Sequence, residues 1–214
     1  MLSGDILTMA NKVAHIIGGG HSSNLYTPQK GLKVACNLPP FEIPNIKFSC
    51  MVDFKMMKAL TEGSVTNPYP WVLGLRPKMW MEKNPSFHMK VAPQIKEFYT
   101  TLPPYAGKGG KGYTNLNCGH FATHYVSNKL KPEEIHLWGF DSIMDFDIRS
   151  RTDFYLPSDR GNMNTERLSA TWRKIFKGIF EEFGDIQYVI HHGHNNIKIE
   201  KPKNLDIVVH KKIA

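Results

Sequence analysis

The chain has 214 residues, and its 27 Lys and Arg outnumber its 19 Asp and Glu, which gives a formal net charge of +8 at pH 7. This length is enough for one sizeable α/β domain with its own core. The hydrophobic and charged fractions, 41% and 21%, are those of soluble globular proteins. No run of eighteen apolar residues occurs, so we expect no membrane span.

The excess of positive charge is compatible with plain solubility, with attraction of a phosphorylated small molecule, and with nucleic-acid binding. Basic residues cluster at Lys108 and Lys111 and again near the C-terminus, but without the aromatic interleaving that is typical of single-strand binders. Residues 1–11 contain an acid and lack a basic segment followed by an apolar one, so they do not resemble a secretory signal.

The cysteines indicate the compartment. Cys36, Cys50 and Cys118 are widely spaced, odd in number and without a CxxC pair. This pattern argues against a disulfide framework or a zinc module. A reducing cytoplasm is the simplest compartment for such a chain.

Apolar runs and turn residues predict the elements in chain order. After an N-terminal arm over residues 1–11, strands are expected at 13–17, 32–36, 48–52, 71–73, 88–91, 97–101, 134–138, 186–190 and 205–209. Helices are expected at 54–60, at 118–129, and over a long segment that Asn162 or Asn164 caps and that ends near Phe183. Residues 67–112, rich in proline and aromatic side chains, are expected to form an irregular insertion or lid, with a mobile glycine- and lysine-rich loop at 106–112.

Strands that alternate with helices predict a mostly parallel sheet with helices on both faces, and hence a single Rossmann-like domain over residues 1–214. Such sheets bind ligands beyond the carboxyl ends of their strands. The residues that follow the predicted strands therefore form the candidate site. They are Gly18, Gly19, Gly20, Ser22, Asn37, Asp53, Asp141, His191, His192 and His194.

The stretch Val13–Ser23 ends a short apolar run in three consecutive glycines, followed by polar residues suited to capping a helix. Free N–H groups and the positive end of the dipole at a helix start suit a phosphate, and glycine lets the main chain approach it closely. The glycines match neither GxGxxG, because Ser23 stands at its last position, nor a Walker A loop. The stretch is either a phosphate-binding loop or an ordinary tight turn between a strand and a helix.

Three further polar residues follow predicted strands. Asn37 stands about where dinucleotide-binding domains carry an acid that holds the ribose, and its amide can bond a ribose or a base edge, or complete a turn. Asp53 and Asp141 suit a sugar hydroxyl, a Mg²⁺ ion or the cap of the next helix. Asp145 and Asp147 have the form of a DxD metal pair, but such short matches are frequent by chance, so no residue is assigned as a metal ligand.

Asn117, Cys118 and Gly119 open a predicted helix and form a second candidate anion site. A cysteine at a helix start can have a lowered pKa, but no partner base is evident, so a positional role is favoured over a nucleophile. Of the histidines after the 186–190 strand, one is a candidate general base. Adjacent residues on an extended chain point to opposite sides, which argues against one shared metal ion.

Taken together, these motifs resemble the sialyltransferase-like superfamily, which includes the bacterial sialyltransferases and the related pterin pyrophosphokinase-like proteins. The likeness spans roughly residues 12–200 and depends on four stretches, Ile16–Ser22, Val34–Asn37, Asn117–Gly119 and Glu134–Asp141. In that family a glycine loop with a serine follows strand one, an asparagine follows strand two, Ser-Gly opens a helix, and a later strand ends in Gly-x-Asp.

The resemblance implies that Gly18–Gly20 and Ser22 surround the nucleotide phosphate. It also implies that Asn37 and Asn117–Gly119 contact the nucleotide or the transferred sugar, and that Asp141 supports that pocket.

Two departures from the family pattern bear on activity. Cys118 stands where the family usually has serine, and the histidine that bacterial enzymes place before the late helix is missing from residues 158–162. Asp159 is a candidate substitute, or His191 or His192 reaches in. Otherwise the protein binds a nucleotide without sialyl transfer.

We therefore expect a transferase that acts on a nucleotide-activated donor, with a sialyltransferase-like glycosyltransferase as the leading hypothesis. Its donor would be a nucleotide sugar, with CMP among the candidate nucleotides, and its acceptor is unidentified. One alternative is a Mg²⁺-dependent pyrophosphoryl or nucleotidyl transferase that holds the ion with Asp53 and Asp141. Another is a non-enzymatic protein that binds a nucleotide or a nucleic acid through its basic surface.

Overall fold

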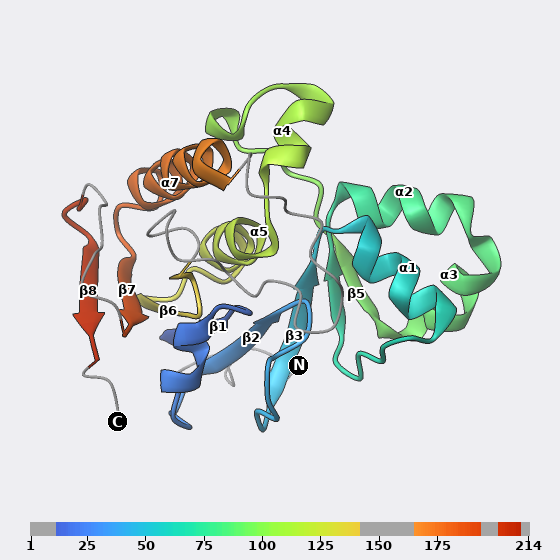
Figure 1. Ribbon diagram of the computed structural model, residues 1–214, viewed down its shortest axis with the longest axis horizontal. Helices are drawn as coiled ribbons and strands as arrows, with labels where there is room; N and C mark the ends of the chain where they lie inside the picture. The colour runs from blue at the N-terminus through green and yellow to red at the C-terminus, as the bar shows by residue number, and fades with distance from the viewer. Residues whose placement is uncertain (1–11, 142–164, 194–200, 211–214) are drawn as a thin grey trace, which may run out of the picture.

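The computed structural model describes residues 12–141, 165–193 and 201–210, with the backbone alone for residues 165–170. These residues contain an eight-stranded sheet in which all neighbouring strands are parallel, in the order β5-β4-β3-β2-β1-β6-β7-β8 (Figure 1). The strands are β1 (Val13–Ile17), β2 (Leu32–Cys36), β3 (Ile46–Met51), β4 (Trp71–Leu73), β5 (Ile95–Phe98), β6 (Glu134–Trp138), β7 (Gln187–His192) and β8 (Leu205–Val209).

Helices connect the strands and cover both faces of the sheet. The α-helices are α1 (Phe54–Glu62), α2 (Leu75–Lys83), α3 (Pro85–Val91), α4 (Gly109–Asn115), α5 (Cys118–Tyr125) and α7 (Thr165–Glu182). Shorter turns are the 3₁₀ helices η1 (His21–Leu25), η2 (Ala92–Gln94) and η3 (Pro104–Ala106), and a π-helical turn η4 (Val126–Leu130) that continues α5.

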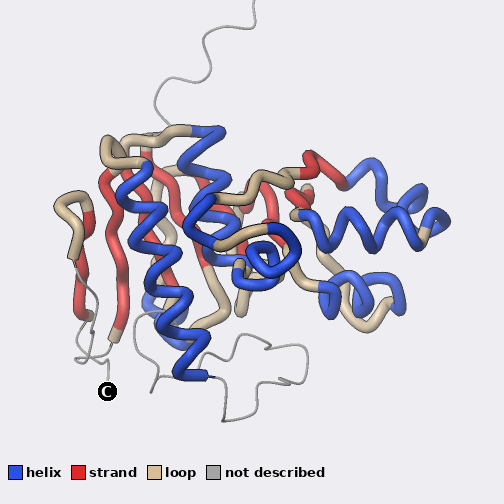
Figure 2. The backbone as a smooth tube through the Cα atoms, turned by 90° about the horizontal axis from the view of Figure 1, so that it is seen from above, coloured by secondary structure: helices blue, strands red, loops and turns tan. Residues whose placement is uncertain are grey.

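Side-chain alternation along the strands divides the core between the two faces. Cys50 of β3 packs in the cluster under α5 and α7, whereas its neighbour Met51 packs with Met56 and Met57 of α1. Helices α4, α5 and α7 lie above the sheet in Figure 1, and α1, α2 and α3 gather at the β5 end, which Figure 2 shows from above. Around β1, β2 and β6, η1 and the 38–45 loop cover the second face, with Ile17, Ala35 and Trp138 in their core.

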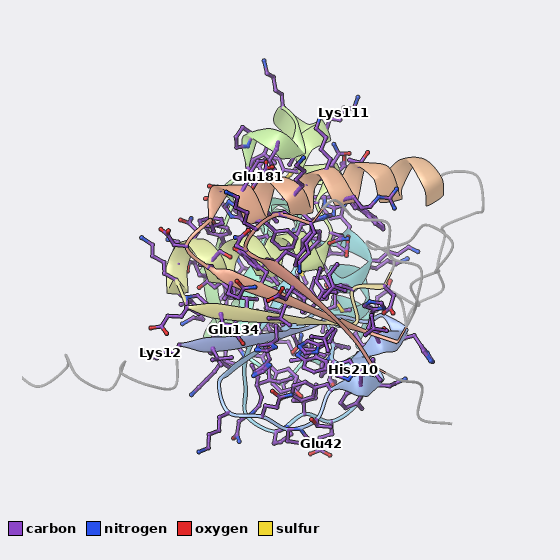
Figure 3. All side chains as sticks on the ribbon, turned by 90° about the vertical axis from the view of Figure 1, so that its left-hand side faces the viewer. Lys12, Glu42, Lys111, Glu134, Glu181 and His210 are labelled. Atoms are coloured by element: carbon purple, nitrogen blue, oxygen red, sulfur yellow. The ribbon has the colours of Figure 1, made fainter. Side chains whose placement is uncertain are left out.

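The order of the strands creates a switch point beside β1. The chain lays down β2 to β5 on one side of β1 and then returns to place β6, β7 and β8 on the other. Ile17, at the end of β1, is in register with Ala35 of β2 and with Trp138 of β6. Figure 3 shows the direction of the strands, with Lys12 and Glu134 at the end where they begin and His210 at the opposite end. Open α/β sheets bind ligands at such a switch point, beyond the carboxyl ends of the strands.

The predicted fold class is confirmed, and five predicted strands, 13–17, 32–36, 71–73, 134–138 and 205–209, have the predicted bounds. Strand β3 starts two residues before the predicted 48–52 strand, strand β5 covers 95–98 in place of 97–101, and α1 extends two residues beyond the predicted 54–60 helix. The capping residues Asn162 and Asn164 lie outside the described residues.

Two predictions in the 67–112 segment are wrong. Residues 88–91, predicted as a strand, belong to helix α3, because Pro85 at its first turn has the backbone angle that starts a helix and needs no hydrogen-bond partner for its nitrogen. The 106–112 loop becomes helical from Gly109, because the missing side chain of Gly112 lets α4 pack against Gly107 and Leu102. The segment expected to be irregular thus extends the sheet by β4 and β5, with helices between them.

Candidate functional site

The loops after β1, β6 and β7 meet at the carboxyl edge of the sheet. The Ser22 backbone N–H donates to Asp141 Oδ2 at 2.9 Å, and the Ser22 hydroxyl donates to Asp141 Oδ1. The N–H of Gly193, just after β7, donates to Ser22 Oγ at 3.3 Å. Ser22 and Asp141 are 2% and 1% exposed, so their hydrogen bonds are made within the protein. We call this group the Ser22–Asp141 cluster.

The glycines after β1 serve close contact between two loops. Gly18 N–H donates to the Trp138 carbonyl at 2.7 Å, and Gly20 N–H donates to the Gly139 carbonyl at 2.9 Å. A Cβ on Gly20 would lie 2.3 Å from Asp141 Oδ2 and 2.4 Å from the Gly139 oxygen. The loop after β6 therefore leaves room only for glycine at position 20. The Ser22 N–H, the kind of donor that could bind a phosphate, is already bonded to the Asp141 carboxylate. Gly19 alone of the three has an N–H without such a bond among the described residues.

A second group forms around Cys118, beyond β2 and β3. The Cys118 thiol lies 3.1 Å from Asn37 Oδ1 and 3.4 Å from Asp53 Oδ2, so Asn37 and Asp53 share it as a donor. Arg76 Nη2 donates to the other oxygen of Asp53, Oδ1, at 3.0 Å. We call these four residues the Cys118 cluster. It joins residues that are up to 81 positions apart in the sequence.

Asn37 is held in an unusual backbone conformation. Its φ is +58°, in the left-handed region that asparagine tolerates better than most residues. Its N–H donates to the Cys50 carbonyl at 2.9 Å, and its own carbonyl accepts from Ser49 and from Asn67 Nδ2. The backbone of Asn37 is thus fixed, while its side-chain Nδ2 has no hydrogen-bond partner among the described residues.

Asn117 and Gly119 position the start of α5. Asn117 Oδ1 accepts from the His120 N–H at 2.9 Å, and the Asn117 N–H donates to His120 Nδ1 at 3.2 Å, a reciprocal cap. A Cβ on Gly119 would lie 2.7 Å from the ring of Phe140. Phe140 precedes Asp141 in the chain, so this contact brings the Cys118 cluster beside the Ser22–Asp141 cluster. Asn117 is a capping residue here, and Gly119 is a packing residue.

Electrostatics disfavour Cys118 as a nucleophile. Burial raises the pKa of its thiol well above the ordinary value, and the Asp53 carboxylate raises it further. The same cause, burial, raises the pKa of Cys36 to about 12. Because the thiolate is the reactive form, Cys118 acts as a hydrogen-bond donor, which is the positional role that the sequence favoured.

Comparison of the chain with protein-family models, with curated proteins and with solved structures finds no match. The resemblance to sialyltransferase-like proteins therefore stays a prediction.

The histidines lie in a different environment from the one predicted. His191 and His192 are the last residues of β7 rather than part of a loop beyond it. The His191 ring stacks on Trp138 with 3.7 Å between ring centres. It shares hydrogen bonds with His136 at 2.7 Å and with His210 at 2.9 Å.

Burial, together with the neighbouring histidines, lowers the pKa of His191 to about 3, which makes it a weak base at neutral pH. His192 is only 2% exposed. These surroundings disfavour His191 as a general base, and the catalytic roles of His191 and His192 stay predictions. Asp159 and His194 lie outside the described residues.

Arg76 is the site residue that the sequence analysis missed. It follows β4 by three positions and lines a cavity of about 10 Å³ with Gly74, Thr101 and Tyr113. That volume is about what one water molecule needs. The sequence does contain a signal for Arg76, because this residue follows the predicted 71–73 strand and ligands bind beyond the carboxyl ends of such strands.

The carboxylates at this edge have separate partners. Asp53 is paired with Arg76 and Cys118, and Asp141 with Ser22. In the part of the chain that the structure describes, no group of three or more His, Cys, Asp or Glu is arranged to hold a metal ion. Among the described residues, too, no helix has the length and apolar character needed to cross a membrane.

Proposed function

We propose that this chain is a transferase that acts on a nucleotide-activated donor, with a sialyltransferase-like glycosyl transfer as the reaction. The observation that carries the proposal is the 3.1 Å contact of Cys118 with Asn37, beside the switch point of a parallel sheet. The family resemblance selects residues after β1, after β2, at the start of α5 and after β6. These residues lie at the same edge of the sheet.

The chemistry of Asn37 suits recognition of a nucleotide. Its Oδ1 accepts from Cys118, which orients the amide and leaves its Nδ2 to donate to a base or sugar oxygen. The Gly19 N–H lies on the neighbouring loop. An N–H preorganised there would stabilise the negative charge that develops on a leaving phosphate. Because Gly20 N–H is taken by Gly139, we assign this role to Gly19 rather than to both glycines.

Mg²⁺ dependence is the less favoured alternative. Asp53 and Asp141 would have to give up an arginine and a serine partner, respectively, to share an ion. We expect donor binding that survives chelation by EDTA.

The direct test is calorimetric titration with CMP, UDP, GDP and ATP, with and without Mg²⁺. Asn37→Gly removes the amide but keeps the left-handed backbone available, which Asn37→Ala does not. The matched control is Asn45→Gly, because Asn45 also has a left-handed φ, +62°, but is exposed and lies just before β3, at the opposite edge of the sheet.

We expect at least one nucleotide to bind the wild type and the Asn45→Gly variant. The Asn37→Gly variant should bind it at least tenfold more weakly, which is the loss of one well-placed hydrogen bond of about 1.4 kcal/mol. Equal affinity of the two variants, or no binding by the wild type, would contradict the proposal.

A further inference from the structure

The backbone fixes Arg76 beside the Cys118 cluster. Helix α2 begins directly after β4, and the N–H of Gly74 donates to the Met51 carbonyl at the end of β3, at 3.0 Å. A Cβ on Gly74 would lie 3.0 Å from Val52, so the start of α2 is packed tightly against the residue that follows β3. The first turn of α2 therefore holds Arg76 at the same edge as Asn37 and Asp53.

The guanidinium of Arg76 is only partly used by the protein. Nη2 donates to Asp53 at 3.0 Å and approaches the Leu116 carbonyl at 3.5 Å. Arginine carries five N–H donors, and among the described residues Nε and Nη1 have no hydrogen-bond partner. The side chain is 20% exposed, so the unused donors lie at the rim and not in the core.

If a phosphorylated molecule binds at this edge, a positively charged side chain is needed to offset the carboxylates there. Asp53 and Asp141 are both carboxylates at strand ends and would repel an oxyanion. Arg76 offsets Asp53 directly, and that ion pair restricts the guanidinium before any ligand arrives. A planar guanidinium held in this way presents its remaining N–H donors in fixed directions, and such charged donors suit phosphate and carboxylate oxygens.

The adjacent cavity limits how a ligand reaches Arg76. It is lined on the apolar side by Val52, Leu75 and Phe121 and has only about 10 Å³ of space. A ring of a base or sugar cannot enter it. An anionic group would therefore lie on the rim, against the unused donors of Arg76, while the rest of the donor extends towards Asn37.

We infer that Arg76 binds the negatively charged group of the donor, a phosphate or a sugar carboxylate, at the carboxyl ends of β3 and β4. This inference rests on the proposed function and names the part of the donor that the Cys118 cluster recognises. Arg76 remains paired with Asp53 through Nη2 when the donor is bound and uses Nε or Nη1, which point to opposite sides of the guanidinium, for the oxyanion.

The test compares Arg76→Gln with Lys78→Gln. Lys78 lies on the same helix, is exposed, and loses the same charge, which makes it the matched control. The probes are cytidine, CMP and CMP-sialic acid, with uridine, UMP and UDP-glucuronate beside them, all measured by calorimetry. Circular dichroism and the thermal midpoint report whether each variant folds, and Arg76→Lys keeps the charge if the glutamine variant does not.

We expect Arg76→Gln to weaken binding of the anionic probe by about tenfold to a hundredfold, the usual effect of losing charge-assisted hydrogen bonds. Loss for the monophosphate with unchanged nucleoside binding assigns the phosphate to Arg76. Weaker binding of CMP-sialic acid or UDP-glucuronate alone, with unchanged binding of the monophosphates, assigns the sugar carboxylate to Arg76. Arg76→Lys should recover part of the affinity, because it keeps the positive charge but lacks the planar guanidinium.

Wild-type affinity in both glutamine variants would overturn this inference and leave the proposed function standing. An equal loss for nucleoside and nucleotide would also overturn it, since that pattern means a structural role. Failure of the wild type to bind any of these probes or any of CMP, UDP, GDP and ATP would overturn the proposed function and this inference with it.

Discussion

Acid should destabilise this protein strongly before its carboxylates are protonated. Burial lowers the pKa of His15 to about 4, and burial lowers the pKa of His120 and of His191 to about 3. Each of these rings is at most 8% exposed. Since an unfolded histidine has a pKa of about 6.5, the unfolded state binds protons first as the pH falls, and stability is lost from about pH 6.5 downwards.

The size of the effect follows from the same values. Between pH 7.5 and pH 5 each of these histidines costs about 2 kcal/mol of unfolding free energy, and the three together cost about 6 kcal/mol. A domain of this kind has about 5–15 kcal/mol in total. Burial also lowers the pKa of His124, which adds to the loss in the same direction.

Urea unfolding at pH 7.5, 6.5, 5.5 and 5.0 measures this loss. The variant His120→Gln removes one titrating ring, whose Nε2 lies 3.0 Å from the Trp172 carbonyl. It should reduce the fall in stability by about 2 kcal/mol, whatever its effect at pH 7.5. The exposed His21 supplies the control, His21→Gln. A free energy that is constant from pH 7.5 to 5 would refute the assignment of these rings as buried and neutral. The same fall in His120→Gln as in the wild type would refute it for His120.

Three further predictions concern the carboxyl edge. Gly20→Ala should lower the unfolding free energy by about 1–3 kcal/mol through its clash with Asp141, whereas Gly110→Ala, which meets nothing within 4 Å in helix α4, should raise it by about 0.5–1 kcal/mol in urea titrations. Equal effects would show that the glycine loop is not packed as described. Ellman's reagent should modify no thiol quickly in the native protein at pH 8, and a fast reaction of one thiol per chain that is lost in Cys118→Ser would disprove the raised pKa of Cys118. Cys118→Ser should bind the nucleotide within threefold of the wild type because a hydroxyl can also donate to Asn37, and a tenfold loss in calorimetry would show that the sulfur itself is needed.

Local pattern was sufficient for most of the fold. The strands β1, β2 and β6 are short apolar runs, and each is followed at once by residues that end a strand: Gly18, Asn37 and Gly139-Phe140-Asp141, respectively. The pattern that identifies each strand therefore lies within a few residues. Pro85 misled the prediction because proline can also start a helix. The sequence contains that signal, but a strand and a short helix of similar length look alike in a short apolar stretch.

The candidate site was predictable as an edge but not as a set of contacts. The parallel-sheet rule brings Asn37 and Asp53 to the same edge as the start of α5, but it does not reveal that Cys118 contacts both. That contact depends on how far α5 lies from the strand ends, which is a matter of packing. The position of His191 is similar, because its stacking on Trp138 follows from β6 and β7 being neighbours.

The most direct test of the central claim is a crystal structure of the protein with the nucleotide that binds most tightly in the calorimetric panel. We predict electron density for the nucleotide beyond the ends of β1, β2 and β6, with a base or sugar oxygen within hydrogen-bond distance of Asn37 Nδ2. Density at any other place, such as the surface groove lined by Tyr105, Lys174 and Lys177, would contradict it.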